Sequence, residues 1–303
     1  MSVVRIIVQL AFILLLPPLL LGVIAKTKAL FAGRRGPPVV QPYHDLLKLW
    51  RKRSVFSRTT TWVFLAGPVV AVTTALVAAT LVPIGAGTSL VSFTGDFLLL
   101  AYLLGLSRFF TMAAALDTGS AFEGMGAARE ATFACLAEPA FILGLLALAR
   151  ATGATSLSGF LGPDLALAWA TTAPSFVLVA AGLFVVLLAE NSRIPVDDPS
   201  THLELTMIHE VMVLDHGGPA LGLILYGAAL KLLLFATILI RLLVPGLPDA
   251  PLGWALGAVA ILAIAVVIGV VESTMARLRL THVPSLLVAA CLLSAFAIVL
   301  MVR

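Results

Sequence analysis

The chain has 303 residues, of which 61% are hydrophobic and 11% are charged, and its mean hydropathy is +1.11. Because ordinary soluble domains are roughly 45–50% apolar, this composition excludes a soluble globular protein. We expect an all-α integral membrane protein in which residues 1–303 form a single membrane domain, surrounded by the lipid bilayer and without a nucleic-acid partner.

Eight apolar windows follow one another along the chain, and a bilayer core needs about 20 apolar residues per helix. The windows lie at 4–25, 62–83, 97–115, 131–150, 166–189, 220–244, 252–272 and 284–302. They predict eight transmembrane helices, although the third and fourth windows are short enough to leave seven spans as an alternative. The first window has no cleavage site after it, since Ala25 leads into Lys26, and should remain as the first helix.

The two cysteines, Cys135 and Cys291, stand alone in apolar windows. Zinc sites and iron–sulfur clusters need several closely spaced ligands. We therefore expect this chain to bind no metal itself, and both thiols to be small buried apolar groups.

Lysine and arginine concentrate in alternate loops, near 26–61, 116–130, 190–219 and 273–283. The positive-inside rule places these loops in the cytoplasm and both termini on the outer side of the cytoplasmic membrane. Acidic residues gather on the same side, which this rule does not explain. Mixed charge on one face predicts a docking surface for a soluble partner, and the alternative is that the loops are merely solvated.

The first of these loops predicts a surface helix. Pro37 and Pro38 favour extended backbone, and a short amphipathic helix is expected from about Tyr43 to Lys52, with its apolar side chains against the membrane surface. The basic run at 51–53 has a simpler interpretation, in which it binds anionic lipid headgroups.

The loop near 116–130 contains Gly124-Met-Gly126, which resembles part of a dinucleotide-binding fingerprint. The match fails, because no strand precedes it and Arg129 stands where the third glycine should be. Asp117 is a candidate helix cap, and Glu123, Arg129 and Glu130 are candidates for ion pairs.

The segment from Ala189 to Gly218 is the richest in polar groups. Asp198 followed by Pro199 predicts the start of a helix that runs to Gly217 and carries His202, His209 and His216 on one face. A zinc-protease motif is absent, because position 213 is valine. Imidazoles and carboxylates in such a setting are suited to proton relay or to pairing with a docked protein, and the alternative is ordinary capping and solvation.

Several charges fall inside or at the ends of the apolar windows: Arg108, Glu138, Glu190, Lys231 and Glu272. An ionisable residue at the bilayer centre costs roughly 2.5–3.5 kcal/mol on insertion scales, so such residues usually face a paired charge or a polar cavity. Together they predict a charged pathway, and the alternative for any one of them is a structural ion pair.

Three blocks, at 34–48, 116–130 and 189–210, carry a family resemblance. They read Arg-Arg-Gly-Pro…Gln-Pro…Asp-Leu-Leu-Lys, then Leu-Asp-Thr-Gly-Ser-Ala-Phe…Arg-Glu, then Ala-Glu-Asn-Ser-Arg-Ile-Pro-Val-Asp-Asp-Pro…His-Leu-Glu-Leu-Thr-Met-Ile-His-Glu. The chain resembles the membrane subunit of formate hydrogenlyases and energy-converting group 4 nickel–iron hydrogenases, which is similar to the quinone-site subunit of respiratory complex I. Ser200 and His202 replace glutamates of the complex I pattern and the first loop is shorter, which favours the hydrogenase branch and argues against a bound quinone.

The resemblance implies a non-catalytic, membrane-anchoring and proton-coupling subunit of an oxidoreductase complex. Its partners would be the soluble large and small hydrogenase subunits, an iron–sulfur protein and an antiporter-like membrane subunit, and the nickel–iron centre and iron–sulfur clusters would lie in those partners. The proton-pathway or coupling candidates are Glu138, Glu190, Asp197, Asp198, Glu204, Glu210, His202, His209, Lys231, Arg193 and Glu272. The docking candidates are Arg34, Arg35, Gln41, Asp45, Lys48, Asp117, Glu123, Arg129 and Glu130.

Two other functions fit the same architecture. The first is a quinone-site subunit of a complex I-type NADH dehydrogenase. The second is an independent secondary transporter or channel, although no internal repeat supports it.

Overall fold

The structure, a computed structural model, describes residues 3–85, 87–198 and 207–302. These residues form helices and loops and contain no strand, and eight of the helices are long and apolar enough to cross a membrane. The eight are α1 (Val3–Phe31), α3 (Trp62–Leu81), α4 (Asp96–Asp117), α5 (Ala121–Thr152), α7 (Asp164–Glu190), α8 (Gly218–Leu243), α9 (Pro251–Thr274) and α10 (Val283–Leu300). The prediction of an all-α membrane protein with eight spans is confirmed, and the seven-span alternative is wrong.

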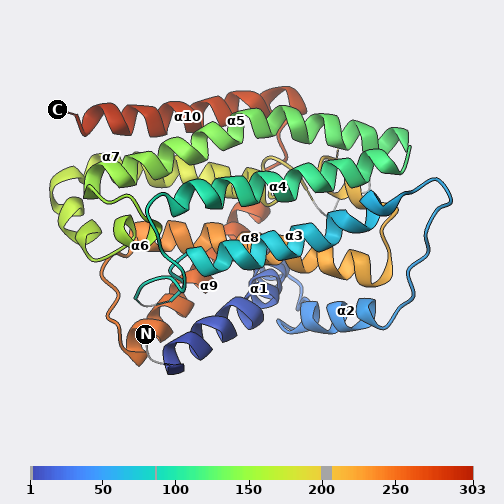
Figure 1. The fold of residues 1–303 in the computed structure, drawn as a ribbon, viewed down its shortest axis with the longest axis horizontal. Helices are drawn as coiled ribbons and strands as arrows, with labels where there is room; N and C mark the ends of the chain where they lie inside the picture. The colour runs from blue at the N-terminus through green and yellow to red at the C-terminus, as the bar shows by residue number, and fades with distance from the viewer. Residues whose placement is uncertain (1–2, 86, 199–206, 303) are drawn as a thin grey trace.

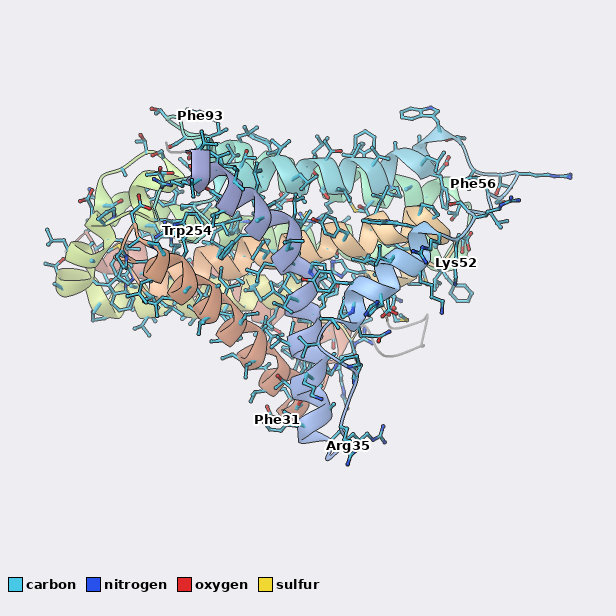
Figure 2. The ribbon with its side chains drawn as sticks, turned by 90° about the horizontal axis from the view of Figure 1, so that it is seen from below. Phe31, Arg35, Lys52, Phe56, Phe93 and Trp254 are labelled. Atoms are coloured by element: carbon cyan, nitrogen blue, oxygen red, sulfur yellow. The ribbon has the colours of Figure 1, made fainter. Side chains whose placement is uncertain are left out.

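The long helices run roughly along one direction, and α1 begins at the same end of the bundle at which α10 ends (Figure 1). Helix α3 packs along α4, and α10 packs against both α5 and α7. Helix α8 lies at the centre, with 67% of its most apolar window buried, and it contacts α1, α3, α7 and α9. Helices α1 and α9 lie side by side and diverge from the rest of the bundle (Figure 2).

Four short helices complete the described chain: α2 (Gln41–Trp50), α6 (Leu157–Phe160), and the 3-10 helices η1 (Glu210–Val213) and η2 (Leu280–His282). Helix α2 corresponds to the predicted amphipathic helix and begins two residues earlier, with a proline in its first turn. It buries Leu46 and leaves Leu47 and Trp50 about half exposed. Its contact with the membrane surface stays a prediction.

Helix α5 begins at Ala121, ten residues before the fourth apolar window. The loop expected at 116–130 is therefore mostly helical, and Glu123 and Glu130 lie in the first turns of a long helix. Gly126 has a packing role there, because a methyl group at this position would lie 2.4 Å from Val211 Cγ1 and 3.0 Å from the carbonyl oxygen of Ile208. Small residues permit this close approach of backbones.

The helix predicted from Asp198 to Gly217 is wrong over 207–217, where the only helical element is the four-residue η1. The rest of that prediction, including Pro199, His202 and Glu204, lies outside the described residues. Side chains from elsewhere bind this backbone and replace helical hydrogen bonds. Asp197 accepts from the N–H groups of Ile208 and His209, each at 3.1 Å, and Glu123 accepts from the N–H of Asp215 at 3.0 Å.

At the end of the bundle opposite to residues 207–217, two arginines connect the ends of several helices. Arg5 pairs with Asp249 at 3.0 Å and donates to the carbonyl oxygen of Thr88 at 3.2 Å. Arg241, at the end of α8, donates to the carbonyl oxygen of Pro83 at 3.1 Å. These contacts join the start of α1, the end of α8 and the loop before α9 to the loop that follows α3.

Candidate functional site: a buried ion-pair network

Arg108, on α4, is the hub of a cluster of ion pairs inside the bundle. Its side chain is 6% exposed, and it pairs with Glu130 at 3.0 Å, with Glu190 at 2.5 Å and with Glu138. Glu130 and Glu138 are eight residues apart on α5, about two helical turns, so they share one face. The sequence marked Arg108 as a charge inside a span but gave no reason to place it at the centre.

Lys231 extends the cluster to the central helix. It lies on α8, and its Nζ is 2.7 Å from Glu190 Oε2. Glu190 therefore lies between two cations, at the end of α7, where its side chain is 5% exposed. The expectation that Lys231 faces a carboxylate agrees with this arrangement, which stabilises a charge that would be costly in lipid.

His209 connects the cluster to the loop after α7. Its Nε2 is 3.1 Å from Glu130 Oε2, and its Nδ1 is 3.7 Å from Asp197 Oδ2. Asp197 also pairs with Arg277, across the bundle, at 3.1 Å. The ion pairs thus form one chain from Arg277 through Asp197, His209 and Glu130 to the Arg108 hub.

The charges on this connection reinforce one another. Burial lowers the pKa of His209, but the neighbouring carboxylates of Glu130 and Asp197 outweigh it and raise the pKa to about 9. Burial raises the pKa of Asp197, but His209 and Arg277 outweigh that effect and hold it below its usual range. At neutral pH His209 is a cation between two carboxylates.

A second, smaller network lies beside the first. Glu272, on α9, pairs with Lys28 on α1 at 2.9 Å and with Arg193 at 3.2 Å, and its carboxylate is fully buried. Arg193 and Asp197 share one tight loop, in which the N–H of Asp197 donates to the carbonyl oxygen of Arg193 at 3.2 Å. Movement of this loop would therefore change ion-pair distances in both networks, at Arg193 in one and at Asp197 in the other.

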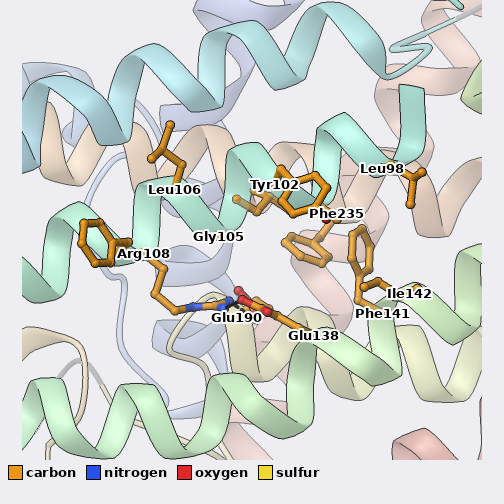
Figure 3. A pocket seen from close by; sticks show the side chains of 13 residues that line it. Leu98, Tyr102, Gly105, Leu106, Arg108, Glu138, Phe141, Ile142, Glu190 and Phe235 are labelled. Carbon is orange, nitrogen blue, oxygen red and sulfur yellow. Dashed lines mark hydrogen bonds and ion pairs between the residues drawn. The ribbon is translucent and has the colours of Figure 1, made fainter. Parts of the chain in front are cut away.

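The main network opens sideways into a cavity of about 490 Å³ between α4 and α5. Figure 3 shows its aromatic walls, with Tyr102, Phe141 and Phe235, and the charged groups of Arg108, Glu138 and Glu190 at its floor. The Glu138 side chain is 49% exposed although it lies in the middle of a span. The inner charges thus reach the lateral surface of the bundle at this point.

The structure brings some predicted residues together and separates others. His216 does not share a face with His209, because it stacks on Phe64 with ring centroids 3.9 Å apart. Asp117 caps α3 rather than its own helix, accepting from the N–H of Thr61 at 2.6 Å and of Phe64 at 3.2 Å. Asp198 and Glu210 are partly buried near the described end of the segment.

The docking candidates divide into two groups. Glu123 and Glu130 are buried, and Arg129 donates to the carbonyl oxygen of Met207 at 2.8 Å, so these three stabilise the chain itself. The other group lies on the surface around α2, where Gln41 donates to Asp45 at 2.9 Å. Its members with exposed side chains are Arg34, Arg35, Asp45 and Lys48.

Among the described residues, no group of three or more His, Cys, Asp or Glu side chains is arranged to hold a metal ion. Cys291 is partly buried, and its Sγ lies 3.3 Å from the carbonyl oxygen of Leu136. Cys135 is exposed on α5, which corrects the prediction that both thiols are buried.

The fold and the buried charges define a multi-pass membrane protein that holds ionisable groups inside its helix bundle. A protein-family model described as NADH dehydrogenase matches residues 4–303. The chain belongs to this NADH dehydrogenase family.

Two curated relatives come from Escherichia coli strain K12. "Formate hydrogenlyase subunit 4" is 32% identical over 293 residues, which cover 94% of each chain. "Hydrogenase-4 component C" is 33% identical over 237 residues, 78% of this chain and 74% of the relative. The H-type subunit of the NADH-quinone oxidoreductase of Rickettsia felis is 26% identical over 221 residues, 68% of this chain and 64% of the relative.

A solved structure shows the same fold. A chain of the membrane-bound sulfane sulfur reductase, an archaeal respiratory membrane complex, superposes with a TM-score of 0.81 at 22% identity, over 98% of this chain and 99% of that one. The relatives confirm the resemblance to the hydrogenase membrane subunit and to the H-type subunit of complex I. The chain is thus a membrane subunit of a complex I-like oxidoreductase complex.

Proposed function

We propose that the chain is the membrane-anchoring and proton-coupling subunit of a hydrogen-evolving nickel–iron hydrogenase complex of the formate hydrogenlyase type. It docks soluble catalytic and iron–sulfur subunits on its cytoplasmic face and links their redox chemistry to its buried charges. The nickel–iron centre and the clusters belong to those partners. The relatives named for formate hydrogenlyase and hydrogenase-4 support this choice.

The observation that carries the proposal is the unbroken chain of ion pairs from the loop after α7 to the lateral cavity. Asp197 and His209 stand at the loop end, Glu130 and Arg108 follow, and Glu138 stands at the cavity. Each group interacts with the next, so a charge change at one end alters the energy of protonation of its neighbours. A docked subunit that moves the loop after α7, or changes the charge beside it, would first alter the ion pairs of Asp197 and His209.

Protons leave the network sideways, through the cavity beside Glu138, and not along α8. Along α8 beyond Lys231, the helix buries apolar side chains from Leu232 to Leu234 and from Ile238 to Ile240, and the arginine contacts then close its outer end. By contrast, the cavity beside Glu138 opens between α4 and α5. An exposed carboxylate in mid-span requires a protein or water neighbour. An antiporter-like membrane subunit is the partner we assign to this face.

Replacing Glu190 with Gln tests the coupling role. In the purified complex the variant should retain its soluble subunits and still evolve hydrogen from an artificial reductant, but move fewer protons per hydrogen molecule in vesicles. Asp249→Asn is the matched control, because it makes the same chemical change in an ion pair at the outer end. Equal proton movement in both variants and the unchanged complex would refute coupling.

The anchoring role has a separate test. Arg34 and Arg35 are exposed and lie on the candidate docking surface. Changing both to Glu should release the soluble subunits during co-purification, because it reverses two charges at the interface. Retention of the full complex would contradict docking at this surface.

A quinone-site subunit is the second candidate, and the NADH dehydrogenase family match favours it. Quinone reduction by the purified complex that responds to quinone-site inhibitors would support this function over hydrogen evolution. Proton transport by the purified chain alone in vesicles would support neither, and would indicate an independent transporter.

A further inference from the structure

The last turn of α2 and the connector that follows it carry an unusual concentration of positive charge. Five of the eleven residues at 48–58 are lysine or arginine, and none is acidic. The five cations are exposed: Lys48, Arg51, Lys52, Arg53 and Arg58. We call residues 48–58 the basic connector.

Its cations, like the exposed Arg34 and Arg35, have no carboxylate partner among the described residues, whereas three other cations of this side do. Lys28, Arg193 and Arg277 each pair with a buried carboxylate of the chain. Within the described ranges, no ion pair involves a cation of the basic connector. Charges that serve only the fold would be expected to pair within it, so these five are available to an external anion.

Contacts with the spans fix the depth of the basic connector. The Ser54 hydroxyl donates to the carbonyl oxygen of Gly217 at 3.3 Å, immediately before α8 begins. A methyl group on Gly218 would lie 2.9 Å from the carbonyl oxygen of Arg53. Helix α3 begins at Trp62, four residues after Arg58, the last cation of the connector. It therefore lies at the ends of two transmembrane helices, where lipid headgroups begin.

Exposed aromatic side chains mark the same depth. Trp50 is 48% exposed, Phe56 is 49% exposed and Trp62 is 72% exposed. Tryptophans of membrane proteins concentrate at the headgroup level. Figure 2 shows Lys52 and Phe56 together at this end of the bundle, whereas Arg35 lies apart at the end of the tilted α1.

We propose that the basic connector binds the headgroups of anionic phospholipids. Its unpaired cations attract the phosphates, while the exposed side chains of Val55 and Phe56 enter the adjoining acyl region. A soluble acidic protein would match the charge but not these apolar groups at headgroup depth. This inference is independent of the hydrogenase assignment, because it concerns the bilayer and not the redox partner.

The test uses the full chain reconstituted in phosphatidylcholine vesicles and follows its tryptophan fluorescence. A small fraction of brominated phosphatidylglycerol should quench more strongly than the same fraction of brominated phosphatidylcholine, since bromine must lie close to Trp50 or Trp62. Each Lys or Arg near the membrane surface contributes about 1 kcal/mol to binding of anionic lipid, which is roughly a fivefold preference for phosphatidylglycerol over phosphatidylcholine. Arg51→Gln with Arg53→Gln should lower the preference by about thirtyfold, and 1 M salt should suppress it in the unchanged chain.

The matched control is Arg34→Gln with Arg35→Gln, which removes the same charge from the same membrane side. This variant should keep the lipid preference and lose the soluble partner in co-purification, while the Arg51 and Arg53 variant should do the reverse. Equal quenching by both lipids in the unchanged chain would overturn the inference. So would equal loss of preference in the two variants, or loss of the soluble partner from the Arg51 and Arg53 variant with its lipid preference intact.

Discussion

Replacement of His209 by Gln should remove a contribution to the stability of the protein that depends on pH in a defined direction. The pKa of His209 is about 9 in the folded protein, against 6.5 for the free side chain. One pKa unit corresponds to about 1.36 kcal/mol, so the difference of about 2.5 units corresponds to about 3 kcal/mol of stabilisation. Because the His209 side chain is 23% exposed, this figure is an upper bound.

The sign follows from the raised pKa. Below pH 6.5 the imidazole is charged in both states and the full stabilisation is present, and it is lost as the pH rises through 9. The free energy of unfolding of the unchanged chain should exceed that of His209→Gln most at pH 6. The difference between these two free energies of unfolding should decrease by about 1.4 kcal/mol per pH unit between pH 6.5 and pH 9.

Denaturant unfolding in mixed micelles between pH 5.5 and 10 measures this difference. His216→Gln is the control of opposite sign, because burial lowers the pKa of His216 and charging it on folding is unfavourable. Relative to the unchanged chain, that variant should gain stability as the pH falls below 6.5. A difference between the His209 variant and the unchanged chain that is constant with pH would refute the assignment of a charged imidazole between two carboxylates.

Three further variants test the packing and charges of the same region. Arg108→Met should lower the free energy of unfolding by roughly 3–5 kcal/mol, since it leaves buried carboxylates without their shared cation, and Arg108→Lys should lower it less. Gly126→Ala should cost about 1–3 kcal/mol, because the added methyl group would lie 2.4 Å from Val211, whereas Gly124→Ala, with only Leu116 at 3.9 Å, should be neutral or slightly stabilising. Asp117→Ala removes the acceptor of two backbone N–H groups at the start of α3 and should cost about 0.5–2 kcal/mol, with a melting curve followed by circular dichroism as the measurement.

The transmembrane helices were predictable because lipid imposes a simple requirement on each of them. A span must be apolar for about 20 residues whatever its neighbours are, so a local average identifies it. The windows consequently match α1, α3, α4, α5, α7, α8, α9 and α10. The start of α5 was missed by ten residues because its first turns contain Glu123, Arg129 and Glu130, which are polar but buried or bonded within the chain.

The segment after α7 was predicted wrongly because its conformation depends on distant residues. Asp198 with Pro199 is a good local signal for a helix start. The Asp197 carboxylate, however, binds backbone N–H groups of Ile208 and His209, and the backbone packs closely on Gly126. Tertiary contacts of this kind override local preference, and the spacing of the histidines could not reveal them.

The candidate site was predictable in its members and not in its connections. Charges inside apolar windows are conspicuous in a sequence, and Glu138, Glu190 and Lys231 were all found in this way. Arg108 was found in the same way, but its place as the shared partner of Glu130, Glu138 and Glu190 was not, because the order of the helices around the bundle decides which charges meet. Hydropathy carries no information about that order, and neither does the spacing of residues along the chain.

The balance of charge explains why such a network can be both stable and responsive. Among the described residues, four cations of the network, Arg108, Lys231, His209 and Arg277, face four carboxylates, Glu130, Glu138, Glu190 and Asp197. Two unit charges about 4 Å apart interact by about 4 kcal/mol at an effective dielectric constant of about 20. One unbalanced charge at the loop end therefore shifts the energies of its neighbours by several times the thermal energy. Glu138, the member with half its side chain exposed at the cavity, is where water or a partner helix can most readily compensate for that change.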